Sequence, residues 1–447
     1  MFRPTSIRRG AALLLVGGLL IVSCDKVDEL LEAENPANIN EDQLDDETLT
    51  NTLVASVQGA LAAEYDNNII WVGSLPTDDQ VSGVNWPQTQ ELGRRILTYD
   101  AADAQGMFRA LSRARFMADS IGARLNTLLP KIGADPTKDR RMALVLAHGG
   151  YVYTLMAEYL CEATIDVGAK IYTPNELAAI AIAKFEQAIT IANAVGSSAN
   201  DVKNLANVGI ARAGMVTGNK AKTMAAAAQV PPSFIWWVEY KDQVNNNVMV
   251  SKTTGGNHQY GVHPSLLDAW GTYGQPIPIS AQTDPRVQFN PTPRTGHDAR
   301  TILYTPFQSQ SHSDWSATAR VPFSNDTDIR LGSYLDAMHN YYEAAGATGT
   351  GPEGTTLEFV NKRRAVGRQA PVTLSGSALM AELREQRFRD LFMGGFRIGD
   401  LRRWKAQGVG DFFPSGTHPN AVLGEYGTAE CFPIPLSEYI GNPNITR

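Results

Sequence analysis

Residues 71 to 86 combine aromatic side chains with carboxylate and amide side chains in one short stretch. The members that could contact a ligand are Trp71, Asp78, Asp79, Gln80 and Trp86. Indole faces stack on sugar rings, while carboxylate and amide groups fix the orientation of a bound molecule. We therefore predict that these five residues contact a sugar or a peptide. In an equally weighted alternative, the indoles pack the stretch onto the protein and the aspartates cap turns.

A second stretch has the same composition and the same two interpretations. It contains Phe307, Gln308, His312, Asp314 and Trp315. We predict that His312 and Trp315 are its ligand contacts.

The adjacent residues Trp236 and Trp237 follow two prolines. Successive side chains of a strand point to opposite faces, so one of two adjacent indoles usually faces away from the other. We therefore predict that this pair lies mostly in the core.

The sequence contains no motif of the zinc proteases, the serine hydrolases or the P-loop nucleotide-binding proteins. A carboxylate pair for glycoside hydrolysis can come from distant positions, so a hydrolase that uses Asp78 or Asp79 stays an alternative. His258 and His263 share a loop, but their spacing fits no common metal site, and we predict that both are solvated. Residues 325–328 are predicted to cap the next helix. The prediction is a protein that is not an enzyme and holds no metal or cofactor.

Apolar residues recur at three- and four-residue intervals over several segments, which predicts helices. The longest helix is predicted from Asp103 to Leu129, with Pro130 ending it. Small residues on these segments allow successive helices to approach closely as helical hairpins, similar to tetratricopeptide units. The other helices predicted in this way are Arg141–Cys161, Pro174–Val195, Asp201–Thr217 and Lys220–Gln229.

Helical periodicity fades in two regions, at residues 66–100 and 230–327. We predict long loops with small β-hairpins there. Long loops in a compact fold are often functional, so we expect a ligand to meet the protein at these regions.

The N-terminus has the features of a bacterial lipoprotein signal. Three arginines precede an apolar run over residues 11–22, which is too short to span a bilayer as a mature helix, and the run ends in Ile21-Val22-Ser23-Cys24. We predict that residues 1–23 are cleaved, that Cys24 is acylated and that residues 24–46 form an acidic tether; an uncleaved signal anchor is the alternative. With a formal net charge of −7, the chain is not expected to bind nucleic acid.

Two further cysteines, Cys161 and Cys431, remain after lipidation of Cys24. Outside the cytoplasm they could form a disulfide, but two buried free thiols are as consistent with the sequence. The sequence leaves both possibilities open.

Residues 383–404 carry closely spaced charges on two predicted helices. Ser377 can cap the first helix, and Gly394 and Gly395 can end it. Arg397 and Asp400 are three residues apart, so the second helix could hold an Arg–Asp pair against the first. We predict that the charged residues of this segment have structural rather than catalytic roles. They include Glu385, Arg387, Arg397 and Asp400.

This segment resembles the C-terminal signature of the SusD/RagB family of outer-membrane nutrient-binding lipoproteins. A second block, with Phe432-Pro433-Ile434-Pro435, Glu438 and Asn442-Pro443-Asn444, resembles the family's last segment. The chain differs from the usual pattern at Gly394, where Glu is common, and at Phe396, where His is common. The matching positions of the first block are Glu385, Arg387, Leu391, Gly395, Arg397, Asp400, Leu401, Arg403 and Trp404.

The resemblance implies a mainly α-helical, SusD-like fold of tetratricopeptide-like helix pairs with long irregular loops and minor β-hairpins. It implies one domain over residues 47–447. It also implies a later helix pair, Ile329–Ala345 and Thr356–Val366, which resembles a helix pair of the family. The helical scaffold is expected at about 103–230 and 328–447, and the ligand-facing regions at about 66–100 and 230–327.

The resemblance also implies a role in nutrient uptake. The expected protein is lipid-anchored in the outer membrane, faces the exterior, binds a glycan and delivers it to a SusC-like TonB-dependent transporter. Uptake of a peptide, as in RagB-like proteins, is the next choice, and a helical-repeat assembly protein without a small ligand is a further alternative. The sequence does not identify the sugar.

Overall fold

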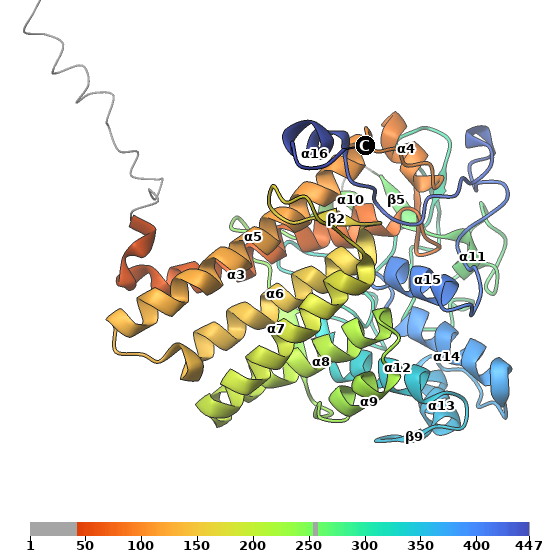
Figure 1. Ribbon diagram of the computed structural model, residues 1–447. Coiled ribbons are helices and arrows are strands. Elements are labelled where there is room, and N and C mark those ends of the chain that lie inside the picture. The colour runs from red at the N-terminus through yellow and green to blue at the C-terminus, as the bar shows by residue number, and fades with distance from the viewer. Residues whose placement is uncertain (1–42, 254–257, 447) are drawn as a thin grey trace, which may run out of the picture. The chain divides into compact units, whose positions relative to one another are not determined.

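The computed structural model describes residues 43–253 and 258–446. The predicted signal peptide, Cys24 and most of the predicted tether lie outside the described residues. Residues Met1–Leu49 and Thr50–Arg447 form two separate compact units. The described part of the first unit consists of the 3₁₀ helices η1 (Gln43–Asp45) and η2 (Glu47–Leu49), and all other elements belong to the second unit (Figure 1).

Long helices build most of the second unit, and all of them except α3 lie in the regions where the sequence predicts helices. They are α3 (Thr50–Glu64), α5 (Ala102–Lys131), α6 (Arg140–Tyr159), α7 (Pro174–Val195), α8 (Asn200–Val216), α9 (Lys220–Ala227) and α12 (Tyr334–Ala345). Figure 1 shows α5, α6, α7 and α8 side by side in chain order, and each contacts the next. α5 runs through Pro130 to Lys131, because a proline in the last turn removes only one backbone donor there.

Glycines allow α6, α7 and α8 to pack closely. The ring of Phe185 on α7 lies against Gly150 of α6 and Gly209 of α8. A Cβ atom at Gly150 would lie 2.6 Å from this ring, and a Cβ atom at Gly209 would lie 2.2 Å from it. No side chain fits at either position, which confirms the prediction that small residues mark the helix crossings.

The C-terminal part adds the helices α13 (Thr356–Val366), α14 (Gly376–Asp390), α15 (Arg397–Ala406) and α16 (Leu436–Gly441). The predicted helix Ile329–Ala345 is wrong at its start, because residues Ile329–Ser333 form strand β8. The hydroxyl of Ser333 caps α12 by accepting a hydrogen bond from the backbone N–H of Asp336 at 3.2 Å. Residues 325–328 therefore precede a strand and do not cap a helix, and α14 begins after Ser375 rather than after Ser377.

The strands are short and pair two by two in antiparallel fashion. Two pairs join distant parts of the chain: β1 (Gln80–Ser82) pairs with β5 (Tyr260–Val262), and β4 (Ile235–Val238) pairs with β8. The hairpins are β2–β3 (Ala163–Thr164, Ile171–Tyr172), β6–β7 (Arg294–Thr295, Ile302–Leu303) and β9–β10 (Thr350–Gly351, Gly354–Thr355).

Residues 66–100 are more regular than predicted. They include the π-helix η3 (Tyr65–Trp71), the 3₁₀ helix η4 (Val72–Ser74), β1 and α4 (Pro87–Gly93). A π-helix lacks the 3.6-residue period of an α-helix, so its apolar residues do not recur at the intervals that predict a helix. Residues 230–327 are mostly irregular, with the short helices α10 (Met249–Thr253) and α11 (Pro264–Leu267). The remaining 3₁₀ turns are η5 (Pro136–Lys138), η6 (Ser197–Ala199) and η7 (Ala421–Leu423).

The carboxylate of Asp390, at the end of α14, is a hub of buried ion pairs. It accepts a hydrogen bond from Arg286 at 2.9 Å and two from Arg363 at 2.7 and 2.8 Å. His339 of α12 contacts the same carboxylate at 2.7 Å. The two guanidinium groups hold the pKa of Asp390 well below its usual range, against the effect of its burial. This hub ties α14 to α12, to α13 and to the irregular region.

Ion pairs also join α14 to α15. Asp400 of α15 accepts from Arg387 of α14 at 2.7 Å and from Arg403 at 3.1 Å. Glu385 pairs with Arg389 one turn later, at 2.6 Å. These contacts are structural, as the sequence predicts for the charged side chains of the segment 383–404.

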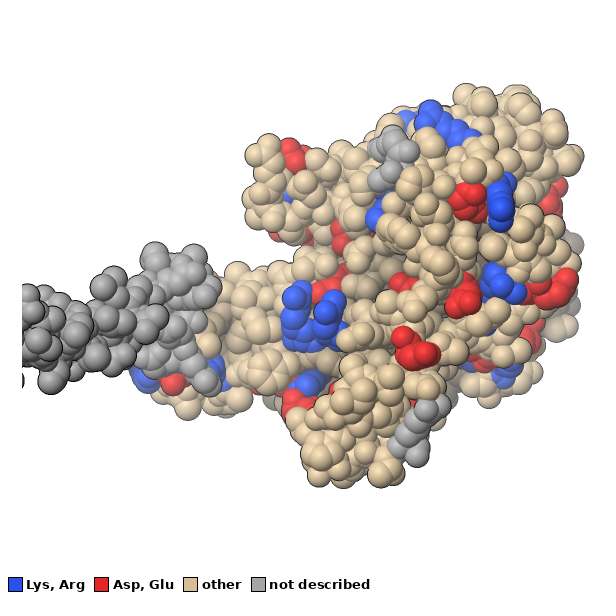
Figure 2. Space-filling view, turned by 90° about the horizontal axis from the view of Figure 1, so that it is seen from above, with Lys and Arg blue, Asp and Glu red and all other residues tan. Residues whose placement is uncertain are grey.

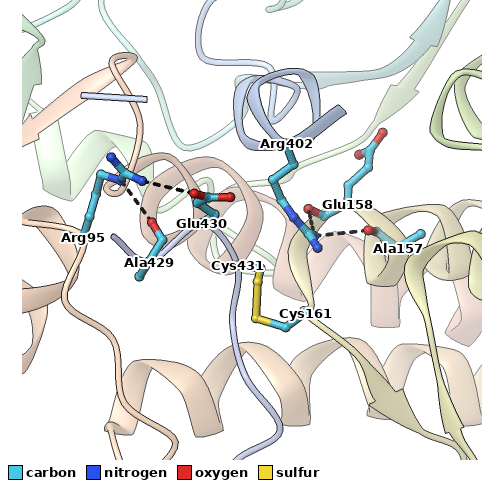
Figure 3. The surroundings of a disulfide bond; sticks show 8 residues. All are labelled: Arg95, Ala157, Glu158, Cys161, Arg402, Ala429, Glu430 and Cys431. Atoms are coloured by element: carbon cyan, nitrogen blue, oxygen red, sulfur yellow. Dashed lines mark hydrogen bonds and ion pairs between the residues drawn. A yellow bond between two sulfur atoms is a disulfide. The ribbon is translucent and has the colours of Figure 1, made fainter. Parts of the chain in front are cut away.

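A disulfide links Cys161, just after α6, to Cys431, and the two Cα atoms are 5.0 Å apart (Figure 3). The structure thus decides between the two possibilities that the sequence leaves open. Beside the bridge, the backbone N–H of Cys161 donates to the carbonyl oxygen of Phe432 at 2.9 Å, and the N–H of Phe432 donates to that of Tyr159 at 2.8 Å. The C-terminal segment is therefore fixed along the end of α6.

Candidate functional site

Trp71, at the end of η3, is covered by other side chains. Its ring lies 6.3 Å from the ring of Tyr260 at an interplanar angle of 23°, and Nζ of Lys252 lies 3.7 Å from its ring centroid. Trp86 meets it edge-on, with the ring centroids 6.2 Å apart. Trp71 is 6% exposed, whereas Trp86 is 47% exposed. Trp86 therefore offers the free indole surface, and Trp71 supports it.

A cavity of about 540 Å³ lies beside the two indoles. It is bordered by the end of α3, by η3, by the start of α4 and by the first half of α5. This volume is in the usual range for small-ligand sites. The polar and charged side chains that border it are Glu64, Asn67, Asn68, Thr89, Asp103, Arg109 and Arg113.

Some of these groups pair with one another, and others are left for a ligand. Arg113 pairs with Glu64 at 2.5 Å, and the Asn68 amide donates to the same carboxylate at 2.6 Å. Among the described residues, the exposed Arg109 has no ion-pair partner, and one carboxyl oxygen of Asp103 is buried without a hydrogen-bond partner. Burial raises the pKa of Asp103. The cavity thus presents an indole and a free guanidinium donor, which suit the ring and the hydroxyl groups of a sugar.

Asp78 and Asp79 have different environments. Arg397 of α15 binds Asp78 through two hydrogen bonds of 2.6 and 2.5 Å. Asp79 is buried, and burial together with the charge of Asp78 raises its pKa to about 7. Gln80 is also buried, and neither atom of its amide has a partner among the described residues. The side chains of Asp79 and Gln80 do not border the cavity beside Trp86, so the structure separates them from that indole.

Asp78 borders a second cavity, of about 430 Å³, with Tyr273, Phe412 and Tyr426. His263, on its wall, contacts the Tyr426 hydroxyl through Nε2 at 3.1 Å. The prediction that His263 is solvated is wrong: it caps α11, is buried, and burial lowers its pKa to about 4. The stretch from Trp71 to Trp86 is therefore divided between two cavities.

The second predicted stretch lies apart from both cavities. His312 is 1% exposed, and burial lowers its pKa to about 3. Its Nδ1 lies 3.2 Å from the Ser309 hydroxyl, and its ring packs edge-on against Phe323. Trp315 is half-buried, and its indole N–H has no partner in the described part of the chain. The structure does not bring His312 or Trp315 together with Trp86.

Hydrolysis of a glycoside requires two carboxyl groups on opposite sides of the scissile bond. Asp78 and Asp79 are neighbours in the chain. Asp78 forms an ion pair with Arg397, and Asp79 is buried. These two residues do not have that geometry. Over residues 43–253 and 258–446, no group of three or more His, Cys, Asp and Glu side chains could hold a metal ion.

The sequence did not single out several residues around Trp86. Arg109 and Arg113 are four residues apart on a predicted helix, so their shared face was recognisable. Asn67 and Asn68 lie in a π-helix, whose period differs from the 3.6-residue period that predicts an α-helix. Lys252 and Tyr260 cover Trp71 from about 180 residues further along the chain, and no local pattern marks such a contact.

Charges of both signs are scattered over the face seen from above in Figure 2. Most of that face is uncharged, and no large field of one sign appears on it. This face therefore offers no broad electrostatic field of one sign.

Comparison with known proteins identifies the fold. No protein-family profile matches the chain, and no curated protein matches it. Solved structures do match. A SusD superfamily protein from Bacteroides vulgatus aligns with a TM-score of 0.62 at 15% identity, covering 90% of this chain and 98% of that one. A SusD homolog from Bacteroides thetaiotaomicron aligns with a TM-score of 0.60 at 16% identity, covering 90% and 97%.

A SusD-like carbohydrate-binding protein from Bacteroides fragilis aligns with a TM-score of 0.64 at 14% identity, covering 90% of this chain and 99% of that one. The chain therefore has the SusD-like fold over nearly its whole described length. This confirms the fold that the sequence resemblance implies.

Proposed function

We propose that this protein is a lipid-anchored, surface-exposed outer-membrane protein that binds an oligosaccharide in the cavity beside Trp86. In this proposal it delivers the oligosaccharide to a SusC-like TonB-dependent transporter and does not cleave it. The single observation that carries the proposal is an exposed indole beside a cavity of about 540 Å³ with free polar groups, in a SusD-like fold.

Three features of the cavity support a sugar as ligand. The Trp86 indole offers an apolar face for stacking on a sugar ring. The guanidinium of Arg109 is exposed and has no ion-pair partner among the described residues, so it can donate hydrogen bonds to ring or hydroxyl oxygens. The amides of Asn67 and Asn68 add donors and acceptors on the η3 side.

Binding to a panel of neutral oligosaccharides, measured by isothermal titration calorimetry, tests the proposal. Trp86→Ala is expected to weaken binding by roughly 1 to 3 kcal/mol, the range for loss of an aromatic anchor. Phe116→Ala is the matched control, because Phe116 is an aromatic residue that is 54% exposed and does not border this cavity. Equal affinities for Trp86→Ala and wild type would refute the site. A panel of short peptides, titrated in parallel, distinguishes a peptide ligand from a glycan.

The anchor and the partner need separate tests. Cys24→Ser is expected to release the protein from the membrane fraction, since acylation supplies the attachment.

Protease treatment of intact cells tests whether the protein faces the exterior. Co-purification with a SusC-like transporter expressed from the same cells tests the partner, and its absence under conditions that preserve membrane complexes would contradict delivery.

A further inference from the structure

A larger cavity, of about 680 Å³, lies where α3, α6 and α8 meet β4 and β8. It shares no bordering residue with the cavity beside Trp86. It is also large enough for a small ligand, and the proposed glycan binding leaves it without a role.

Both indoles of the adjacent pair Trp236 and Trp237 border this cavity, and both are half-buried. The pairing of β4 with β8 explains why the prediction of a core position is wrong. Trp236 pairs with Gly332 and Trp237 with Arg330, so β8 has one additional residue, Leu331, between them. Such a bulge bends and twists the strands locally and re-aims side chains, which relaxes the alternation that the prediction assumed.

Carboxylates beside the indoles give this cavity an excess of negative charge. Glu239 follows β4, is exposed and has no ion-pair partner among the described residues. The carboxylate of Asp328 accepts a hydrogen bond from the backbone N–H of Tyr240 at 2.8 Å and forms no ion pair with another described residue. Burial raises the pKa of Asp328, and the charge of Glu239 raises it further.

The other charged groups at the cavity are already paired. Asp201 pairs with Arg140 at 2.5 Å, and Lys241 lies 3.7 Å from Asp326. Neither pair changes the net charge of the cavity. The excess therefore comes from Glu239 and Asp328.

A buried histidine adds an acceptor. His148 of α6 is 3% exposed and borders the cavity, with its ring edge-on to Trp236 at 5.8 Å. Its Nδ1 bonds to the carbonyl oxygen of Leu144 at 3.0 Å, which places a proton on Nδ1. Burial lowers its pKa to about 4, so the ring is neutral near pH 7. Nε2 then has a free lone pair, and it has no partner among the described residues.

We propose that this cavity binds a primary ammonium group, held against the indoles of Trp236 and Trp237 by the carboxylates of Glu239 and Asp328. Indole faces attract cations, and carboxylates beside them add charge-assisted hydrogen bonds. The Nε2 atom of His148 can accept a further N–H. Two kinds of ligand carry this group, an amino sugar and the lysine side chain of a peptide.

Paired probes that differ only in charge test the proposal by calorimetric titration of the full chain. One pair is a glucosamine tetramer and its N-acetylated counterpart, and the other is a lysine tetrapeptide and its Nε-acetylated counterpart. A free-amine probe is expected to bind at least about tenfold more tightly than its acetylated partner. Added salt should weaken the binding of the free-amine probe, because salt screens the attraction between charges. The probe pair that shows this difference identifies the source of the ammonium group.

Two variants test the residues. Glu239→Gln changes an exposed side chain without altering its size and is expected to weaken binding of the free-amine probe about tenfold. Trp237→Ala is expected to do the same, and the circular dichroism spectrum reports whether it folds. Phe116→Ala is the control and should bind as the wild type does. Equal binding of charged and acetylated probes, or unchanged binding by both variants, would overturn the proposal.

These outcomes are independent of the proposed glycan site. Glu239→Gln should leave binding of neutral oligosaccharides unchanged, because Glu239 does not border the cavity beside Trp86. Failure of ammonium binding with intact glycan binding refutes only this inference, and the reverse result refutes only the glycan site.

Discussion

Removal of the Cys161–Cys431 disulfide is expected to lower the free energy of unfolding by about 3 to 5 kcal/mol. The two cysteines are 270 residues apart in sequence, so the bridge closes a very long loop in the unfolded chain. The chain-entropy relation gives about 5.6 kcal/mol at 25 °C for such a loop, and the loss of a native disulfide typically costs roughly 2 to 5 kcal/mol. The expected value is the upper part of the measured range, because a long loop favours a large effect and native disulfides usually contribute less than the chain-entropy relation gives.

The local geometry indicates that the effect comes from the unfolded state. Two backbone hydrogen bonds, of 2.9 and 2.8 Å, join Phe432 to Cys161 and Tyr159 beside the bridge. Arg402 also donates to the carbonyl oxygens of Ala157 and Glu158, at 3.2 and 2.6 Å (Figure 3). Because these contacts do not need the sulfur atoms, the native structure is expected to persist without the bridge.

The assay is urea unfolding of the Cys161→Ser/Cys431→Ser double variant against the oxidised wild type, followed by tryptophan fluorescence. Wild type with a reductant should unfold at the same urea concentration as the variant. A loss of less than about 1 kcal/mol would refute the entropic reasoning. A changed circular dichroism spectrum of the folded variant would show instead that the bridge shapes the native structure.

Three further predictions concern buried groups. Asp390→Asn is expected to destabilise the protein by roughly 3 to 5 kcal/mol, because Arg363 then lacks its charged partner and Arg286 keeps only its pair with Asp284; urea unfolding measures this loss, and an unchanged midpoint would contradict the hub. Acidification from pH 6 to pH 5 is expected to reduce stability by roughly 2 to 4 kcal/mol, because the unfolded chain then binds more protons than the folded chain. Burial lowers the pKa of five histidines to about 3 or 4, whereas the raised pKa values of Asp66 (about 6) and Asp79 (about 7) offset part of the effect. These histidines are His148, His263, His312, His339 and His418. Urea unfolding at both pH values tests the sign, and equal or greater stability at pH 5 would contradict it. Trp71→Ala is expected to cost roughly 3 to 5 kcal/mol of stability, since Trp71 is covered by Tyr260 and Lys252, and thermal unfolding distinguishes this from a pure effect on binding.

The sequence predicted the helical scaffold well because its signals are local. The apolar period of α7, its proline at the first turn and Gly196 at its end lie within one segment. The signal for close packing is local as well. Gly150 and Gly209 are small residues within single helices, and they leave room for the ring of Phe185. The charges of residues 383–404 were recognisable in the sequence, but their pairing was not. Asp400 pairs with Arg387, 13 residues away, and Arg397 binds Asp78 instead of Asp400.

The candidate site was predicted only in part, because its contacts are not local. Trp71 and Trp86 do lie together, but Tyr260 and Lys252 cover the first of them, and that decides which indole is free. Arg397 reaches Asp78 across 319 residues. Strand β8 was mistaken for a helix because its partner β4 lies about 90 residues earlier. Pairing between distant segments overrode local preference in that case.

The cysteine content limits how the disulfide can form. The chain has three cysteines in all. If Cys24 carries lipid, as proposed, its thiol is no longer available for oxidation. Cys161 then has a single possible partner within the molecule, and no incorrect intramolecular pairing exists to be repaired. An exported chain of this kind needs an oxidant and has no need of disulfide isomerisation.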